Sequence, residues 1–204
     1  MELAALIPIF VTLFVVIDPI GLVPIFVALT AGMTARERRN IALRACLIGL
    51  LVLTLFGLFG EAVLGFVGIS MGAFRIAGGL LLFLTALEML FSKRRARREN
   101  EAEESREDPS VFPLATPPIA GPGAIASMIL LINDGGWVEV ATVHAVMASV
   151  VALTFLLFQT AGTIERLLGP TGVNVVTRLL GMLLAALAVQ FVLDGLSEAM
   201  GLTF

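Results

Sequence analysis

The stretch Asp18-Pro19-Ile20-Gly21-Leu22-Val23-Pro24 lies in the middle of an apolar run from about Leu3 to Leu29. Such a run is long enough to cross a bilayer, whose hydrocarbon core is about 30 Å thick. Proline lacks a backbone donor and disfavours a helical conformation at the residue before it. A charged side chain at the bilayer centre costs about 2.5–3.5 kcal/mol on insertion scales. We therefore predict a membrane segment that is interrupted at Asp18, with its freed backbone facing protein or a water-filled cavity.

The composition places the whole chain in a membrane. Of its 204 residues 58% are hydrophobic and 14% are charged, and the mean hydropathy is +1.02. A soluble domain could not bury so much apolar surface, and continuous apolar runs favour helices over a β-barrel. Cys46 is the only cysteine, so there is no disulfide or dithiol pair within the chain. We predict an all-α membrane protein.

Six apolar segments can be delimited, at about residues 3–29, 41–59, 73–91, 111–132, 138–158 and 175–196. We expect a glycine-rich turn at 60–72, between the second and third segments. The fourth segment resembles the first, because it contains Pro113, Pro117, Pro118 and Gly121-Pro122-Gly123 and should also be broken. Residues 92–110 form a hydrophilic linker with a basic start and an acidic remainder. The predicted division is therefore 1–91, 92–110 and 111–204.

The Lys and Arg residues predict the orientation. With six spans and an outside N-terminus, the loop at Arg36, the linker at 92–110 and Arg166 all lie in the cytoplasm. Of the 13 Lys and Arg residues, only Arg75 then lies outside. If the first and fourth segments were re-entrant hairpins, Arg166 and Arg178 would move outside, which fits the charge rule less well. We expect both termini outside and the linker in the cytoplasm of a bacterial cytoplasmic membrane.

A shift of 103 residues aligns the two halves, placing Pro19 on Pro122, Gly32 on Gly135, Arg75 on Arg178 and Gly78 on Gly181. Three spans per half make this a 3+3 inverted repeat, an arrangement that recurs in secondary transporters. In such folds the substrate binds where the broken helices meet. The predicted substrate-binding residues are Asp18, Pro19, Ile20, Gly21, Gly121, Pro122, Gly123 and Ala124, supported by the polar residues Arg75, Arg178 and Gln190.

Four motifs in order resemble the MarC family of bacterial and archaeal membrane proteins. The stretch from Asp18 to Phe26 is similar to its first signature, Asp/Asn-Pro-x-Gly-x-x-Pro-x-Phe. The stretches 112–115 and 120–125 are similar to its second, and 74–79 and 178–181 to further patterns. The resemblance implies six spans and kinship with SnatA-type transporters of small neutral amino acids, within the wider LysE-like group. Many members have asparagine in place of Asp18 and a polar residue in place of Leu22.

The chemistry of a broken helix suits a zwitterionic substrate. A half-helix N-terminus attracts anions and a C-terminus attracts cations, and glycines let a ligand approach the backbone. Asp18 has three interpretations: a proton carrier, a cation ligand, or the N-cap of the second half-helix, for which Asp before Pro is well suited. Arg75 and Arg178 either extend to lipid headgroups or contact substrate.

Two further polar positions in the last two segments have structural interpretations. Gln190 could line a cavity, and Asp194, four residues later on the same helix face, is expected to cap the outer end of the last segment. His144 is expected to be a packed, hydrogen-bonded histidine rather than a metal ligand.

These observations predict a multi-pass secondary transporter of small solutes, with small neutral amino acids as the first substrate class. The expected partners are the lipid bilayer, a small-molecule substrate and a coupling proton or cation, without nucleic acid, cofactor or metal. The chain lacks a nucleotide-binding loop, and no enzymatic activity is expected. The alternatives are a non-transporting membrane scaffold or stress-response protein, and an exporter of another small metabolite.

Overall fold

The computed structural model describes residues 3–91, 119–132 and 136–201, and every element in these ranges is an α-helix. Five helical stretches are long and apolar enough to cross a membrane, counting Leu6–Leu29 as one, and the helix Pro122–Leu131 is apolar but shorter. The predicted all-α membrane class is confirmed. The predicted linker at 92–110 and the prolines at 113–118 lie outside the described residues. The helices are α1 (Leu3–Ile17), α2 (Pro19–Leu29), α3 (Ala35–Val67), α4 (Met71–Leu90), α6 (Pro122–Leu131), α7 (Gly136–Gln159) and α8 (Ala161–Met200).

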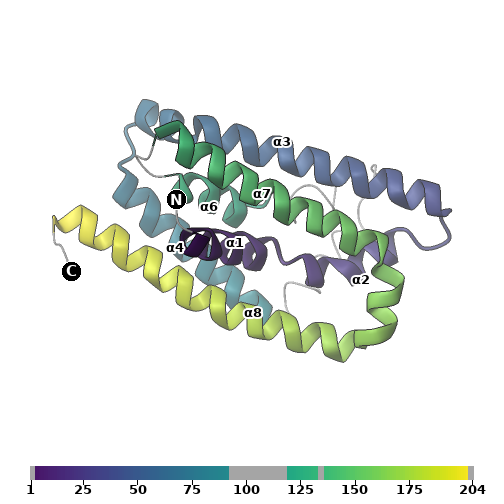
Figure 1. The fold of residues 1–204 in the computed structure, drawn as a ribbon. Helices are drawn as coiled ribbons and strands as arrows, with labels where there is room; N and C mark the ends of the chain where they lie inside the picture. The colour runs from purple at the N-terminus through teal and green to yellow at the C-terminus, as the bar shows by residue number, and fades with distance from the viewer. Residues whose placement is uncertain (1–2, 92–118, 133–135, 202–204) are drawn as a thin grey trace.

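The helices form three layers (Figure 1). Antiparallel α3 and α7 make one outer layer, and antiparallel α4 and α8 make the other. The short helices α1, α2 and α6 lie between these pairs and contact both of them. The core follows the same plan, because α2 buries most of its side chains whereas α3 and α8 bury only one side. The interrupted segments are thereby placed in the interior of the molecule.

The α4–α8 layer is held by small residues that let two backbones touch. A Cβ placed on Gly72 would lie 3.1 Å from the carbonyl oxygen of Gly195, and one on Gly79 would lie 2.8 Å from that of Ala188. A Cβ on Gly181 would lie 3.3 Å from the carbonyl oxygen of Ala86. These residues recur every seventh position on both helices, the spacing of left-handed supercoils. We call them the α4–α8 seam: Gly72, Gly79 and Ala86 facing Gly195, Ala188 and Gly181.

The glycine-rich turn that we predicted at 60–72 is wrong for most of its length. Helix α3 continues to Val67 and ends at Gly68, which adopts a left-handed conformation with φ 81°. Gly60 lies inside this helix. Its missing side chain leaves room for Ile129 of α6, whose Cγ1 occupies the position that a Cβ would take. Glycine inside a membrane helix thus marks close packing here rather than a turn.

The last segment is longer than predicted, and Asp194 does not cap it. Helix α8 runs from Ala161 to Met200 with a kink at Gly169, where φ is 59° and ψ is 175°, just before Pro170. Its C-terminal cap is Gly201, in a left-handed conformation. Asp194 therefore lies inside the helix, and the prediction that it caps the outer end is wrong, because the polar residues after it continue the helix.

The outer faces of the long helices are apolar. Helix α3 exposes Leu47, Leu51 and Leu55 at a helical spacing, and α8 exposes Leu179 and Leu183. Exposed apolar surface of this extent is the surface that a membrane protein presents to lipid. Trp137, at the start of α7, is 83% exposed and suits the membrane–water interface.

Candidate functional site

The first interruption is a single buried residue, Asp18. Helix α1 ends at Ile17 and α2 begins at Pro19, while Asp18 between them has φ 55° and ψ 61° in the left-handed region. Asp and Asn are among the few residues that tolerate this conformation. The side chain is 1% exposed, and its Oδ1 accepts a hydrogen bond of 3.1 Å from the Gly21 N–H. Asp18 is therefore the N-cap of α2, and Pro19 occupies the first helical position, where proline is favoured.

Gly21 is required by this cap. A Cβ placed on Gly21 would lie 2.7 Å from Asp18 Cγ and 2.9 Å from its Oδ1. Any side chain at position 21 would displace the carboxylate from the helix end. The spacing Asp-Pro-x-Gly thus describes one structural unit: a carboxylate folded back over the first turn of α2, with a glycine beneath it.

The second interruption has no such cap. Gly121 has an extended backbone, with φ −76° and ψ 168°, and Pro122 begins α6. The Ile125 N–H donates to the Gly121 carbonyl at 2.9 Å, which starts the helical hydrogen bonds. Within the described ranges no side chain caps α6, and Gly121, Gly123 and Ala124 are all buried. The two half-helices therefore begin in the same way, with proline at the first position, but only α2 carries its own carboxylate.

The structure brings the two interruptions together. A Cβ placed on Gly123 would lie 3.4 Å from Val16 Cγ1, two residues before Asp18. It would also lie 3.0 Å from Leu82 Cδ2 and 3.9 Å from Thr85 Oγ1, both on α4. Gly123 therefore lies where the end of α1, the middle of α4 and the start of α6 meet.

Two buried hydroxyl-bearing residues adjoin this meeting point, and sequence reasoning missed both. Ser127 lies one turn along α6 from Gly123; it is fully buried, and its Oγ has no hydrogen-bond partner. Thr12 lies one turn before Val16 on α1 and is 3% exposed. Helices α1 and α6 run in opposite directions (Figure 1), and each of these two residues lies one turn along its helix from the contact between Val16 and Gly123. The available signal was the hydroxyl residue Thr12 in the first interrupted segment and Ser127, besides Thr116, in the fourth.

The last residue of the first motif has a packing role. Phe26 of α2 stacks on Phe158 of α7, with ring centroids 4.5 Å apart and planes 9° apart. Arg38, at the start of α3, lies over the same Phe26 ring at 5.7 Å. This arrangement fixes the end of α2 between two long helices and gives the motif a structural reason to end in an aromatic residue.

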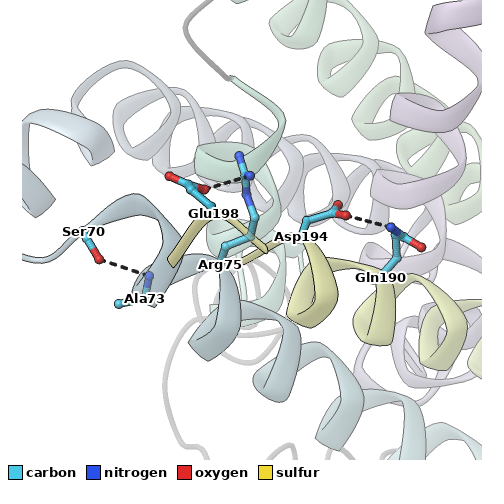
Figure 2. A network of polar contacts seen from close by, with 6 residues as sticks. All are labelled: Ser70, Ala73, Arg75, Gln190, Asp194 and Glu198. Carbon is cyan, nitrogen blue, oxygen red and sulfur yellow. Dashed lines mark hydrogen bonds and ion pairs between the residues drawn. The ribbon is translucent and has the colours of Figure 1, made fainter. Parts of the chain in front are cut away.

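The predicted supporting residues form contacts on α4 and α8 (Figure 2). Arg75 Nη1 pairs with Glu198 Oε2 at 2.9 Å, which joins the start of α4 to the end of α8. Gln190 Nε2 donates to Asp194 Oδ1 at 2.7 Å, and Gln190 is exposed. Arg178 also lies on an exposed position of α8. These contacts involve the outer pair, whereas the two interruptions meet in the central layer.

His144 of α7 is packed and hydrogen-bonded, as expected. Its Nδ1 lies 2.7 Å from the Val140 carbonyl oxygen, which can only accept, so Nδ1 carries the proton. Its Nε2 is buried without a partner, 2.9 Å from the place of a Cβ on Gly57 of α3. Within the ranges that the structure describes, no three His, Cys, Asp or Glu side chains come together to hold a metal ion.

Known proteins similar to this chain are membrane proteins of one kind. The UPF0056 membrane protein YvbG of Bacillus subtilis is 41% identical over 96% of both chains. The UPF0056 membrane protein MJ1677 of Methanocaldococcus jannaschii is 34% identical over 98% of this chain and its own full length. YhcE of Escherichia coli, another UPF0056 membrane protein, is 36% identical over 92% of this chain and 89% of its own. No solved structure is significantly similar. The model of the MarC family of integral membrane proteins matches residues 3–200, so the chain belongs to the MarC family.

Proposed function

We propose that this protein is a secondary transporter of small solutes, with small neutral amino acids as its first substrate class. The observation that carries the proposal is the contact between the two interruptions: Gly123 of α6 meets Val16, two residues before the buried Asp18. Interrupted helices that meet inside a membrane protein are the usual form of a transporter substrate site. The amino-acid class is inferred from the resemblance to SnatA-type transporters.

The packing of the short helices supports a 3+3 inverted repeat. Helix α2, from the first half, packs against α7 and α8 of the second half. Helix α6, from the second half, packs against α3 and α4 of the first. This exchange is the pattern expected of two halves related by a pseudo-twofold axis. We propose that the halves extend over 1–91 and 111–204, joined by the linker 92–110.

The surroundings of Gly123 favour a small substrate. Leu82 and Val16 approach within 3.0 and 3.4 Å of the position of a Cβ there, so a bulky ligand group has little room. The predicted binding residues Asp18–Gly21 and Gly121–Ala124 supply helix ends rather than a set of charged side chains. Such ends bind without covalent chemistry, and the proposal therefore includes no enzymatic step. A proton or another cation is the proposed coupling ion.

We further propose that the protein lies in the cytoplasmic membrane with both termini outside. Arg36, Arg38 and Arg39 begin α3 at one end of the molecule, and Arg166 lies near the start of α8 at the same end (Figure 1). Arg75 lies in the first turns of α4, which begins at the opposite end. The positive-inside rule assigns the first end to the cytoplasm.

The test is uptake of labelled alanine and glycine into proteoliposomes, with and without an inward proton gradient. We expect uptake by the wild type that disappears in Gly123→Leu, because the new side chain fills the meeting point of α1, α4 and α6. The matched control is Gly65→Leu, since Gly65 of α3 has no atom within 4 Å of the position of a Cβ.

The outcomes separate the alternatives. Uptake that ignores the gradient keeps transport and removes the proton as coupling ion. Uptake that survives in Gly123→Leu removes the meeting point as the site. A folded wild type without uptake of either amino acid supports the exporter of another metabolite or the non-transporting scaffold.

A further inference from the structure

We propose that the carboxylate of the transported solute binds at the start of α6, on the backbone N–H groups of Gly123 and Ala124, with the Ser127 hydroxyl as a further donor. The start of α2 does not bind it, because Asp18 already occupies that end. This inference rests on the proposed transport function and assigns the two interruptions different roles. The ligand class is a small monocarboxylate, amino acids included.

The difference between the two helix starts is the first observation. The shift of 103 residues places Asp18 on Gly121, Pro19 on Pro122 and Gly21 on Ala124. In α2 the Asp18 carboxylate accepts a hydrogen bond from Gly21 N–H. In α6 the corresponding N–H belongs to Ala124, and the residue in the place of Asp18 is a glycine that offers no carboxylate. Among the described residues, the second half therefore has the donor of this hydrogen bond without a side-chain acceptor.

Burial makes that missing acceptor significant. The first N–H groups of a helix have no acceptor within the helix, so side chains, water or ligands must satisfy them. Gly123 and Ala124 are buried, and α6 has no side-chain cap. A helix start also favours negative charge. A carboxylate at this position would make the hydrogen bond that Asp18 makes in α2.

Ser127 is the second, independent observation. Its side chain is fully buried and its Oγ has no hydrogen-bond partner. Among the described residues, Thr177 of α8 also has a buried hydroxyl without a partner. Two buried hydroxyl-bearing residues, Thr30 and Thr154, donate to the carbonyl four residues earlier, at 2.7 and 2.9 Å. Ser127 does not. It shares a helix face with Gly123, one turn along α6, and the Cα–Cβ bond of a helical residue tilts toward the N-terminus.

The test measures the thermal unfolding of the purified full-length protein with three probes at equal ionic strength: alanine, propionate and ethylamine. A ligand that binds only the folded state raises the unfolding temperature. We expect alanine and propionate to raise it and ethylamine, which lacks the carboxylate, to leave it unchanged. Alanine uptake into proteoliposomes is measured in parallel, so that the subsite and the transport function are tested separately.

Three variants test the residues. Gly121→Asp supplies the missing carboxylate from the chain itself, at a backbone conformation that N-cap residues prefer. We expect it to raise the unfolding temperature without ligand and to abolish the shifts by alanine and propionate. The control Gly65→Ala, at a position on α3 with no atom within 4 Å of a Cβ, should keep both shifts. Ser127→Ala should unfold no earlier than the wild type, yet need about tenfold more alanine for the same shift, because it loses a hydrogen bond to a charged group.

The results distinguish failure of the subsite from failure of the function. If Gly121→Asp and Ser127→Ala transport and bind alanine like the wild type, the subsite is wrong and transport stands. If ethylamine raises the unfolding temperature as much as alanine does, the proposed carboxylate subsite is also overturned. If Gly65→Ala, far from the start of α6, also loses the shifts, they do not report binding at that helix start and the subsite is overturned. A folded wild type that neither takes up alanine nor responds to any probe overturns both proposals.

Discussion

At the scale of single residues, Asp18 and Gly21 form one structural unit, the N-terminal cap of α2. A left-handed conformation costs a non-glycine residue about 1–2 kcal/mol. The buried cap offsets this cost, since replacing an N-cap Asp by Ala typically loses about 1 kcal/mol. Asn could serve here as well, because its side-chain oxygen is also an acceptor and it also tolerates the left-handed region. A cap role thus requires an oxygen rather than a charge.

Asp18→Asn should therefore retain the fold, whereas Asp18→Ala should lower the free energy of unfolding by about 1–2 kcal/mol. The measurement is thermal or denaturant unfolding in one detergent. Retained gradient-dependent uptake in Asp18→Asn would show that Asp18 does not carry the coupling proton. Equal stability of Asp18→Ala and the wild type would contradict the cap.

Gly21→Ala tests the same cap through the glycine that lies beneath the Asp18 carboxylate. Its methyl group would occupy the place of the Asp18 carboxyl, 2.7 Å from Cγ, so we expect a loss of about 1–3 kcal/mol despite the better helix propensity of Ala. In the double variant Asp18→Ala, Gly21→Ala, the clash is absent and the second substitution should cost much less. Additive losses would mean that the two residues are not coupled.

The sequence predicted part of this residue-scale detail. An Asp before a Pro already indicates an N-cap, and the structure has one. The unpartnered hydroxyl of Ser127 could not be predicted, because a Ser or Thr inside an apolar helix usually bonds its own backbone, as Thr85 and Thr142 do. Which hydroxyl lacks that bond depends on rotamers and neighbours, which the sequence does not specify.

At the scale of elements, the α4–α8 seam binds one helix of each half to the other. Gly79 is its centre, since a Cβ there would lie 2.8 Å from the Ala188 carbonyl oxygen and 3.0 Å from the Val192 nitrogen. Backbone atoms cannot rotate away as side chains can, so the helices themselves would have to separate. The neighbouring glycines have different partners: Gly79 meets α8, whereas Gly78 meets Leu130 and Ala126 of α6.

Gly79→Ala should therefore lower the free energy of unfolding by about 1–3 kcal/mol. Gly65→Ala is the matched control, because Gly65 is helical, has open space around it and should gain up to about 1 kcal/mol from helix propensity. Both are measured by unfolding in the same detergent. A seam that tolerates Ala at position 79 as well as position 65 does would not be in backbone contact.

The ion pair at the end of this layer should contribute little to stability. Arg75 and Glu198 have side chains 18% and 43% exposed, so water screens their attraction. A double-mutant cycle with Arg75→Met and Glu198→Gln should give a coupling energy of about 0.5 kcal/mol. A coupling energy several times larger would mean that the ion pair is shielded from water and contributes substantially to the contact between α4 and α8.

At the scale of the whole molecule, two antiparallel pairs enclose the interrupted segments. Apolar runs predicted the helices but not this layering, because both buried and lipid-facing residues are apolar. They also did not predict the length of α3, whose glycines indicated a turn. At 33 residues α3 is about 50 Å long and exceeds the hydrocarbon core, so we expect its two ends to emerge on opposite faces.

Single cysteines at the two ends of α3 test this topology. In a Cys46→Ala background, Ile69→Cys lies in the turn after α3 and Ala31→Cys in the turn before it, and both positions are exposed. In the proposed orientation, the arginines at the start of α3 lie in the cytoplasm. We therefore expect an impermeant maleimide to label Ile69→Cys in intact cells and Ala31→Cys only after permeabilisation. The opposite pattern would invert the orientation, and labelling of both positions from outside would mean that α3 does not span the membrane.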